Sequence, residues 1–305
     1  MKPRISCVMP VYNTAVYLAE AIESILCQTF DDFELVISND GSQDESSEII
    51  ARYAAKDPRI VSLSRTENRG LVFTRNELLD HSRGEWVATM DSDDISLPDR
   101  FERQISFINA NPGYDVIGSE AMLIDPDGHP MCAMGVELTH DEIDAWHMAG
   151  STGTAFVSPT SMIRTDALRA VNGYREHNGC AEDYDLFLRL AEKGKLRTMP
   201  GVLLLYRQHF GSLGYDSNRE QRNGIRWAVE DAYKRRGEPM PEDLFDEPIP
   251  NRTESYAYRQ WSEWSLRGGN VDSARHYGWK AIALAPWSPR GWRALARAWT
   301  TNDAA

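Results

Sequence analysis

The sequence predicts an α/β protein in which a mostly parallel sheet is covered by helices. In the first half of the chain, short apolar runs alternate with segments of helical spacing, which is the pattern of such sheets. The apolar runs end in polar residues, at the strand ends where sheets of this kind bind ligands. The 305 residues, 42% hydrophobic and 26% charged, suit a globular protein with a sizeable core.

Periodicity places the first elements. Residues 5–12 form a short apolar run that ends before Asn13, and residues 33–40 form a second one. Between them, residues 16–28 have helical spacing. The apolar face predicted for this helix consists of Val16, Ala19, Ile22, Ile25 and Leu26.

The alternation continues toward the middle of the chain. Ser42 and Glu45 fit a capping box that opens a helix over residues 45–55. A third strand is predicted over residues 59–68 and a third helix over residues 71–82. A fourth strand follows over residues 85–94, and then a helix from about Pro98.

The middle of the chain is less regular. Residues 114–130 predict a long strand and a turn, and residues 158–175 a strand, a short helix and an Asn172–Gly173 turn. An amphipathic helix over residues 181–195 has Leu186, Leu188 and Leu190 on its apolar side, and Gly194 suits its end. Residues 196–209 read as the last strand.

Near residue 215 the alternation of strand and helix patterns gives way to helical patterns alone, which predicts that the chain has two parts. We expect an α/β domain over residues 1–215 and a helical extension over residues 216–305. The Pro-rich, acidic stretch 238–251 is typical of a linker or an exposed connection.

Charge and cysteine content exclude some classes of protein. A net charge of -13 with a pI of about 5.0 argues against a nucleic-acid partner. The four cysteines form no C-x-x-C pair, and we expect buried free thiols at Cys7, Cys27, Cys132 and Cys180. Neither a signal peptide nor a membrane-spanning apolar run is visible, so we expect a cytoplasmic protein.

Acidic residues gather at the end of the fourth predicted strand. Asp91, Asp93 and Asp94 follow the apolar run within four positions, and like charges this close repel unless a cation lies among them. A metal ion, helix caps and a solvated loop are all compatible with this pattern. Asp40 and the Asn68–Gly70 segment end neighbouring strands, where they fit either ligand contacts or plain turns.

Five segments together carry a family resemblance: VMPVYN, VISNDGSQDES, TENRGL, MDSDD followed by LPDR, and AEDYDLFLRL. Their order and spacing over residues 4–213 resemble the family 2 glycosyltransferases. These are inverting enzymes with the GT-A fold that use nucleotide-diphosphate sugars. The resemblance therefore implies a Rossmann-like, mostly parallel sheet flanked by helices and a divalent cofactor, Mn²⁺ or Mg²⁺.

The resemblance also implies roles for single residues. Asp183 matches the catalytic base, with Glu182 beside it. Asp93 matches the metal-binding acid, Asp91 lies near ribose and metal, and His209 is a candidate third ligand. Substrate contacts are implied for Pro10, Val11, Tyr12, Asp40, Asn68, Arg69, Gly70, Asp91, Ser92, Glu182 and Arg207.

Elementary chemistry agrees with these roles. A nucleoside diphosphate leaves better when a metal neutralises it, and an acceptor hydroxyl needs a base as it attacks. Attack on the face opposite the leaving group inverts the anomeric centre. Read by themselves, Glu182 and Asp183 are equally compatible with first-turn acids favoured by a helix dipole.

The C-terminal part resembles one tetratricopeptide-type helical hairpin over about residues 256–299. Its matching positions are Leu266, Gly269, Ala274, Tyr277, Ala281, Leu284 and Pro286. The last helix, with Arg290, Arg293, Arg297, Trp292 and Trp299, fits a packed helix, a dimer contact or a helix on the inner face of a membrane.

The function expected from these features is transfer of a sugar, with a UDP-sugar favoured as donor, to a hydroxyl of a glycan or lipid-linked acceptor. Polysaccharide or glycoconjugate biosynthesis is the expected setting, by analogy with the family. The alternative is a protein of the same fold that binds nucleotide sugars or glycans without catalysis. A nucleotidyltransferase is disfavoured because no Gly-rich basic loop follows the first strand.

Overall fold

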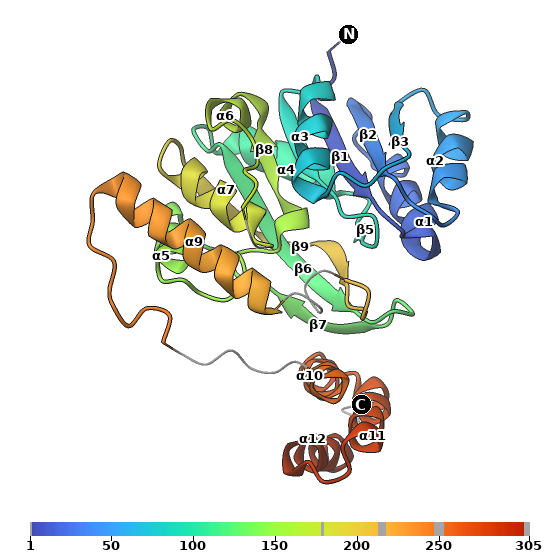
Figure 1. Cartoon of the computed structure of the whole chain (residues 1–305). Coiled ribbons are helices and arrows are strands. Elements are labelled where there is room, and N and C mark those ends of the chain that lie inside the picture. Colours follow the sequence, from blue (N-terminus) through green and yellow to red (C-terminus); the bar gives the residue numbers. More distant parts are fainter. Residues whose placement is uncertain (1, 178–179, 213–217, 247–252, 302–305) are drawn as a thin grey trace.

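The computed structural model describes residues 2–177, 180–212, 218–246 and 253–301. It confirms the α/β fold: a curled sheet is flanked by helices, and further helices follow at the C-terminus (Figure 1). The nine strands form one sheet in the order β3-β2-β1-β4-β8-β6-β9-β5, and β7 pairs with β6.

Four parallel strands make up the first half of the sheet. They are β1 (Ile5–Val11), β2 (Phe33–Asp40), β3 (Ile60–Arg65) and β4 (Trp86–Thr89). The helices between them are α1 (Ala15–Leu26), α2 (Ser46–Ala54) and α3 (Leu71–His81). Because the strands are parallel, their carboxyl ends meet at one edge, as the sequence predicted.

The second half of the sheet is mixed. It contains β5 (Ile95–Ser96), β6 (Val116–Ile124), β7 (Pro130–Met134), β8 (Met162–Arg164) and β9 (Leu196–Arg207). Strand β8 is antiparallel to both β4 and β6, whereas β9 is parallel to β6. The helices here are α4 (Arg100–Ala110), α5 (His140–Met148), α6 (Thr165–Ala170) and α7 (Glu182–Ala191), with a 3-10 turn over Ser158–Thr160.

The core lies on both faces of the sheet. In β1, Cys7 and Met9 join the cluster under α1 and α4, whereas Val8 joins the cluster under α3 and α7. A strand with helices on both faces buries every side chain, which is why these strands read as continuous apolar runs. The same burial raises the pKa of the Cys7 thiol to about 12.

Several local predictions need correction. Cys27 is exposed rather than a buried thiol, and Cys180 is half-buried. Val16 is 85% exposed, because the buried face of α1 is formed by Leu18, Ala21, Ile22 and Ile25. The capping box of Ser42 and Glu45 does not form; Asp44 accepts from the Ser46 amide instead, at 3.1 Å. Gly194 lies just past the end of α7, where its amide donates to the Leu190 carbonyl at 2.9 Å, but it does not adopt the left-handed φ of a glycine cap.

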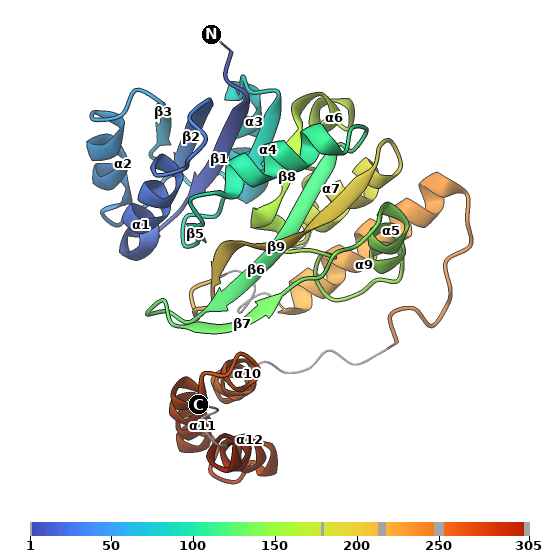
Figure 2. The ribbon, with the colours of Figure 1, turned by 180° about the vertical axis from the view of Figure 1, so that it is seen from behind.

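Residues 218–246 and 253–301, the C-terminal residues that the structure describes, contain four helices. Helix α9 (Asn218–Arg236) packs its apolar side on α5 and α7, and Figures 1 and 2 both show it beside them. The remaining helices, α10 (Glu254–Arg267), α11 (Val271–Leu284) and α12 (Pro289–Thr300), form a three-helix unit on β7. The range predicted for the hairpin, about residues 256–299, contains three helices rather than two, and its matching positions lie in α10, in α11 and in the turns that follow them. The expected boundary near residue 215 lies outside the described residues.

Buried His147 links α5 to the rest of the domain in its neutral form. Its Nδ1 lies 2.8 Å from the Ile143 carbonyl, and its Nε2 accepts from the Ala155 amide at 3.3 Å, which fits a ring protonated on Nδ1 alone. Burial lowers the pKa of His147 from 6.5 to about 4. As the pH falls, His147 therefore binds a proton near pH 6.5 in the unfolded chain but only near pH 4 in the folded chain.

Because the pKa of His147 is lowered by folding, we expect the folded protein to lose stability on acidification. Between pH 7 and pH 5 we expect His147 to contribute about 2 kcal/mol of the lost free energy of unfolding. Urea unfolding at both pH values should show a drop smaller by about that amount for His147→Gln than for the wild type. The exposed His276→Gln variant is the matched control and should behave like the wild type. Equal drops in wild type and His147→Gln would contradict the assignment.

Candidate active site

The acidic loop begins where β4 ends. Asp91 to Asp94 connect β4 to the short strand β5, at the edge where the parallel strands end. Asp93 Oδ2 lies 2.9 Å from His209 Nε2, and the buried Ser92 hydroxyl accepts from Thr14 Oγ1 at 2.9 Å. Asp94 is 1% exposed; its Oδ1 accepts from the Arg207 amide, and its Oδ2 has no hydrogen-bond partner.

A buried cation that the sequence reading missed lies among these acids. Arg75 of α3 donates to Glu182 Oε1 at 2.8 Å, and its guanidinium is 3.6 Å from Asp91 Oδ1. The same guanidinium lies over the ring of Tyr174, 5.3 Å from the centroid. Arg75 therefore joins the strand-end acids to the start of α7, and its place in an unremarkable helix gave no signal of this.

The electrostatics of the site reflect this crowding. Burial raises the pKa of Asp91 to about 6; Asp93, Asp183 and Glu182 add to the rise, and Arg75 opposes it. Burial and the neighbouring Glu182 also raise the pKa of Asp183. Burial opposes the charge on Arg75, but the surrounding acids outweigh that effect and raise its pKa. The four acids thus share one electrostatic site.

Asp183 and Glu182 form the first turn of α7, where acids are favoured by the helix dipole. Asp183 Oδ1 accepts from the Tyr184 amide at 2.8 Å, while Glu182 is buried against Arg75. This arrangement places Asp183, the predicted base, next to the strand-end acids.

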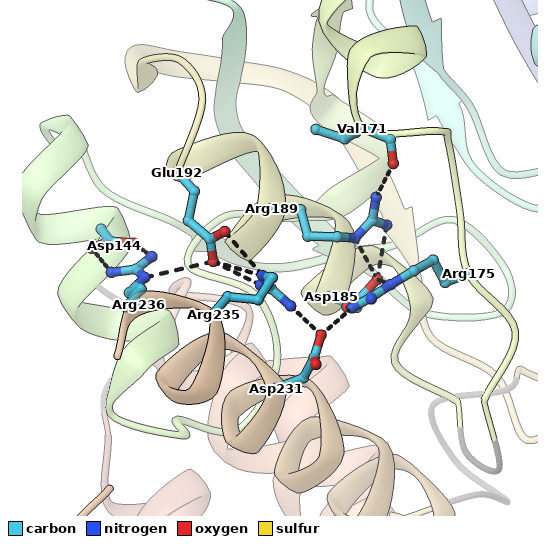
Figure 3. Close-up of polar contacts among 9 residues, drawn as sticks. All are labelled: Asp144, Val171, Arg175, Asp185, Arg189, Glu192, Asp231, Arg235 and Arg236. Atoms are coloured by element: carbon cyan, nitrogen blue, oxygen red, sulfur yellow. Dashed lines mark hydrogen bonds and ion pairs between the residues drawn. The ribbon is translucent and has the colours of Figure 1, made fainter. Parts of the chain in front are cut away.

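An ion-pair network, buried at Asp185 and Arg189 and partly exposed elsewhere, joins α7 to its neighbours (Figure 3). Asp185 is fully buried between Arg175 and Arg189, and Asp231 of α9 also pairs with Arg175, at 2.7 Å. The network continues along α7 and α9 to the helix α5 through Asp144, Glu192, Arg235 and Arg236. Four acids and four arginines balance one another, so the network fixes the helix that carries Asp183 without adding net charge to the site.

Arg207 lies under the acidic loop and is turned away from solvent. Its side chain is 3% exposed, and it donates to the Asp93 carbonyl at 2.9 Å, the Pro126 carbonyl at 3.0 Å and Glu20 Oε2 at 2.6 Å. The guanidinium also lies over the ring of Tyr17. In this structure the Arg207 guanidinium is engaged in holding the acidic loop. It is therefore not free for the predicted contact with substrate.

Asp40 organises the predicted Asn68–Gly70 turn. Its carboxylate accepts from Arg65 at 2.6 Å and from the amides of Arg69 and Gly70 at 2.9 Å each. A carboxylate offers about four acceptor positions, so about one remains for a ligand. Gly41, at φ +73°, allows the close approach of this turn, since a Cβ there would lie 2.7 Å from the Asn68 amide nitrogen.

The segment of Pro10, Val11 and Tyr12 ends β1 at the same edge. Tyr12 is 49% exposed, Pro10 is half-buried, and Val11 is buried, so only its backbone faces the edge. Asn13, at φ +53°, accepts from the Gln43 amide at 2.7 Å and so joins the loops that follow β1 and β2. Asn68 and Arg69 are exposed, and the Arg69 guanidinium stacks on Phe73 at 3.9 Å.

Two places in the structure carry candidate ligands for a divalent cation. In the acidic loop, Asp93 Oδ2 lies 2.9 Å from His209 Nε2, so each side chain could offer one ligand atom, and the neighbouring Asp94 has a buried oxygen without a hydrogen bond. In the turn between β6 and β7, the ligand atoms of Asp125, Asp127 and His129 lie within 4.8 Å of one another. There, Asp125 is already engaged by the Asp127 and His129 amides and by the Tyr277 hydroxyl.

A mostly parallel sheet that presents acids at its carboxyl edge is compatible with a glycosyltransferase, the class that the sequence resemblance implied. The model of glycosyl transferase family 2 matches residues 6–170, more than half of the chain. The chain therefore belongs to glycosyl transferase family 2.

Known proteins agree with this assignment. The putative glycosyltransferase EpsE of Bacillus subtilis (strain 168) is 35% identical over 195 residues, which are 63% of this chain and 68% of that protein. S. aureus TarS 1-349 in complex with UDP-GlcNAc has a similar fold, with a TM-score of 0.62, 18% identity and coverage of 97% of this chain and 89% of that one. The Pyrobaculum calidifontis mannosyltransferase PcManGT, in complex with GDP-Man and Mn2+, gives a TM-score of 0.57 at 19% identity, over 97% and 79% of the two chains.

Removal of the positive charge of Arg75 should destabilise the folded protein. We expect Arg75→Met to lower the free energy of unfolding by roughly 3 kcal/mol, because Glu182 and Asp91 then lose their buried partner. Arg103→Met, which breaks the exposed pair with Asp99, is the matched control and should cost less than about 1 kcal/mol. Urea unfolding of both variants measures the difference. Similar losses in the two would show that Arg75 is not needed to neutralise the acids.

Proposed function

We propose that this chain is an inverting, metal-dependent glycosyltransferase. It moves a sugar from a nucleotide-diphosphate donor to a hydroxyl group of a glycan or glycolipid. The observation that carries this proposal is the grouping of Asp91, Glu182 and Asp183 around Arg75 at the carboxyl edge of the sheet, with Asp93 close to Asp91. Acids from two distant segments meet there, which capping of a single helix does not explain.

Asp93 and His209 are the proposed metal ligands, with Asp91 beside them. A divalent cation bound there, Mn²⁺ or Mg²⁺, would neutralise the charge that develops on the leaving diphosphate. Arg207 holds this loop through the Asp93 carbonyl, and its amide holds Asp94, so the ligands are fixed before donor binds. The Mn2+ in the PcManGT complex supports a cation of this kind in the same fold.

Asp183 is the proposed base. Its raised pKa makes it a better proton acceptor than an ordinary carboxylate, and the network on α7 keeps it in place. In the proposed step, the acceptor oxygen attacks the anomeric carbon as its proton passes to Asp183. The bond from that carbon to the diphosphate breaks on the opposite face, so the configuration inverts.

The nucleotide is proposed to bind between Tyr12 and Asp40. Exposed Tyr12 offers a ring for base stacking, and the remaining acceptor position of Asp40 suits an N–H of the base, such as that of uracil. A UDP-sugar is therefore favoured, and the UDP-GlcNAc complex of TarS supports it. Residues 1–215 are the proposed catalytic domain, with residues 216–305 as its extension, in polysaccharide or glycoconjugate biosynthesis.

Nucleotide binding tests the donor and the metal together. We expect one of UDP, GDP, CDP and dTDP, with UDP favoured, to raise the melting temperature only when Mn²⁺ is present, because ligand binding to the native state stabilises it. Asp93→Ala should abolish the shift. Asp127→Ala, in the other candidate ligand group, is the matched control and should keep it. A shift lost in Asp127→Ala but kept in Asp93→Ala would move the metal site to the β6–β7 turn.

The base can be tested once the donor is known. We expect Asp183→Asn to bind donor and metal as the wild type does, and to lose transfer by about 10²–10⁴-fold, the range typical of positioned bases. Release of nucleoside diphosphate in the presence of glycan acceptors measures transfer. Asp166→Asn, an exposed first-turn acid of α6, should retain full activity. Normal transfer by Asp183→Asn would refute its role, and binding without transfer in the wild type would favour a binding protein.

A further inference from the structure

The helices α11 and α12 present an unusual exposed surface. Four of the nine tryptophans of the chain lie between Ser273 and Thr301. All four are exposed: Trp279 at 52%, Trp287 at 80%, Trp292 at 47% and Trp299 at 57%. Indole rings of this size are normally buried, so their exposure on one small unit points to an interaction surface.

Three of these rings gather where α11 passes into α12. Trp279 and Trp292 are in contact, with ring centroids 6.4 Å apart. The Trp292 Nε1–H donates to the Pro286 carbonyl at 2.8 Å, and Trp287 follows that proline directly. These residues, Trp279, Pro286, Trp287 and Trp292, are called the tryptophan corner below.

The tryptophan corner is not the packing face of α12. Gly291, Ala294, Leu295 and Ala298 form the buried side of that helix, and Gly278 of α11 packs on Leu295. The exposed side carries Trp292, Arg293, Arg297 and Trp299. One side of α12, made largely of small residues, therefore packs on the rest of the protein, and a separate side carries exposed tryptophan and arginine residues.

The charge around the tryptophan corner is opposite to that of the chain. From Ser273 to Thr301 there are five Lys and Arg residues and no Asp or Glu, whereas the whole chain has 33 basic and 46 acidic residues. The five are Arg275, Lys280, Arg290, Arg293 and Arg297. Arg275 pairs with Asp272 at 3.6 Å, just before this stretch. The excess of positive charge that remains, on a chain of net charge -13, indicates an anionic partner.

We propose that the tryptophan corner and its flanking basic residues bind the surface of a bilayer that contains anionic lipids. Tryptophan side chains favour the headgroup region, where an apolar ring and a polar N–H are both accommodated, and Lys and Arg are attracted to anionic headgroups. Among the residues that the structure describes, no helix is long and apolar enough to cross a membrane. Contact at the surface is therefore the mode of binding proposed, and it does not depend on the sugar-transfer reaction.

Vesicle flotation of the full chain tests this surface. We expect the wild type to float with vesicles of phosphatidylcholine and phosphatidylglycerol, to stay behind with phosphatidylcholine alone, and to be released by high salt. The variants Trp287→Ser/Trp292→Ser and Arg293→Glu/Arg297→Glu should each reduce the floated fraction at least tenfold. Melting curves establish that the variants are folded.

Matched control variants distinguish binding through the tryptophan corner from non-specific binding of any exposed tryptophan or basic residue to vesicles. Trp146→Ser on α5 removes another exposed tryptophan, and Arg219→Glu on α9 reverses another exposed charge. Both should float as the wild type does. The proposal is overturned if the wild type does not bind anionic vesicles, or if the controls lose binding as the corner variants do. A third result would also overturn the proposal. In that case the wild type does not bind vesicles, light scattering shows that it is a dimer, and the Trp287→Ser/Trp292→Ser variant is a monomer.

Discussion

The structure depends on how buried carboxylates are neutralised at the carboxyl edge of the sheet. Each cluster of acids has an arginine placed within it: Arg75 for Asp91 and Glu182, and Arg65 for Asp40. Burying a charge without a partner costs several kcal/mol, so these arginines stabilise the fold at this edge. The Asp94 Oδ2 atom is left without a hydrogen bond in the described structure, and burial together with Asp93 and Asp91 raises the pKa of this carboxyl group.

Much of this site could be predicted from sequence because strand ends are visible as local patterns. An apolar run that ends in Asp91 or Asp40 places the acid at the sheet edge, whatever the rest of the chain does. Arg75 was missed because its partners Asp91 and Glu182 lie 16 and 107 positions away, and nothing in its own helix distinguishes it. Burial of the Arg207 guanidinium could not be predicted, because it depends on contacts with Glu20 and Pro126, which lie far away in the sequence.

The error in the predicted capping box has a structural cause, which is competition from tertiary contacts. Helix α2 begins at Ser46, and the Ser42 hydroxyl accepts from the Asn13 amide at 3.0 Å instead of from an amide of the helix. Asp44 likewise accepts from the Ala15 amide at 2.9 Å while it caps the helix at Ser46. Both contacts join the loops that follow β1 and β2. A capping motif read from sequence describes one helix, whereas here the same side chains organise two loops that flank the proposed nucleotide site.

The C-terminal unit is joined to the proposed metal loop by a chain of buried contacts. The Tyr277 hydroxyl of α11 donates to Asp125 Oδ2 at 2.7 Å, and Arg207 donates to the carbonyl of the next residue, Pro126, at 3.0 Å. Arg207 in turn holds Asp93 and Asp94. Tyr277 and Asp125 are both nearly inaccessible to water, so this path is rigid compared with a flexible tether. A helical unit that binds a membrane through one side would therefore hold the catalytic edge at a defined position relative to a lipid-linked acceptor.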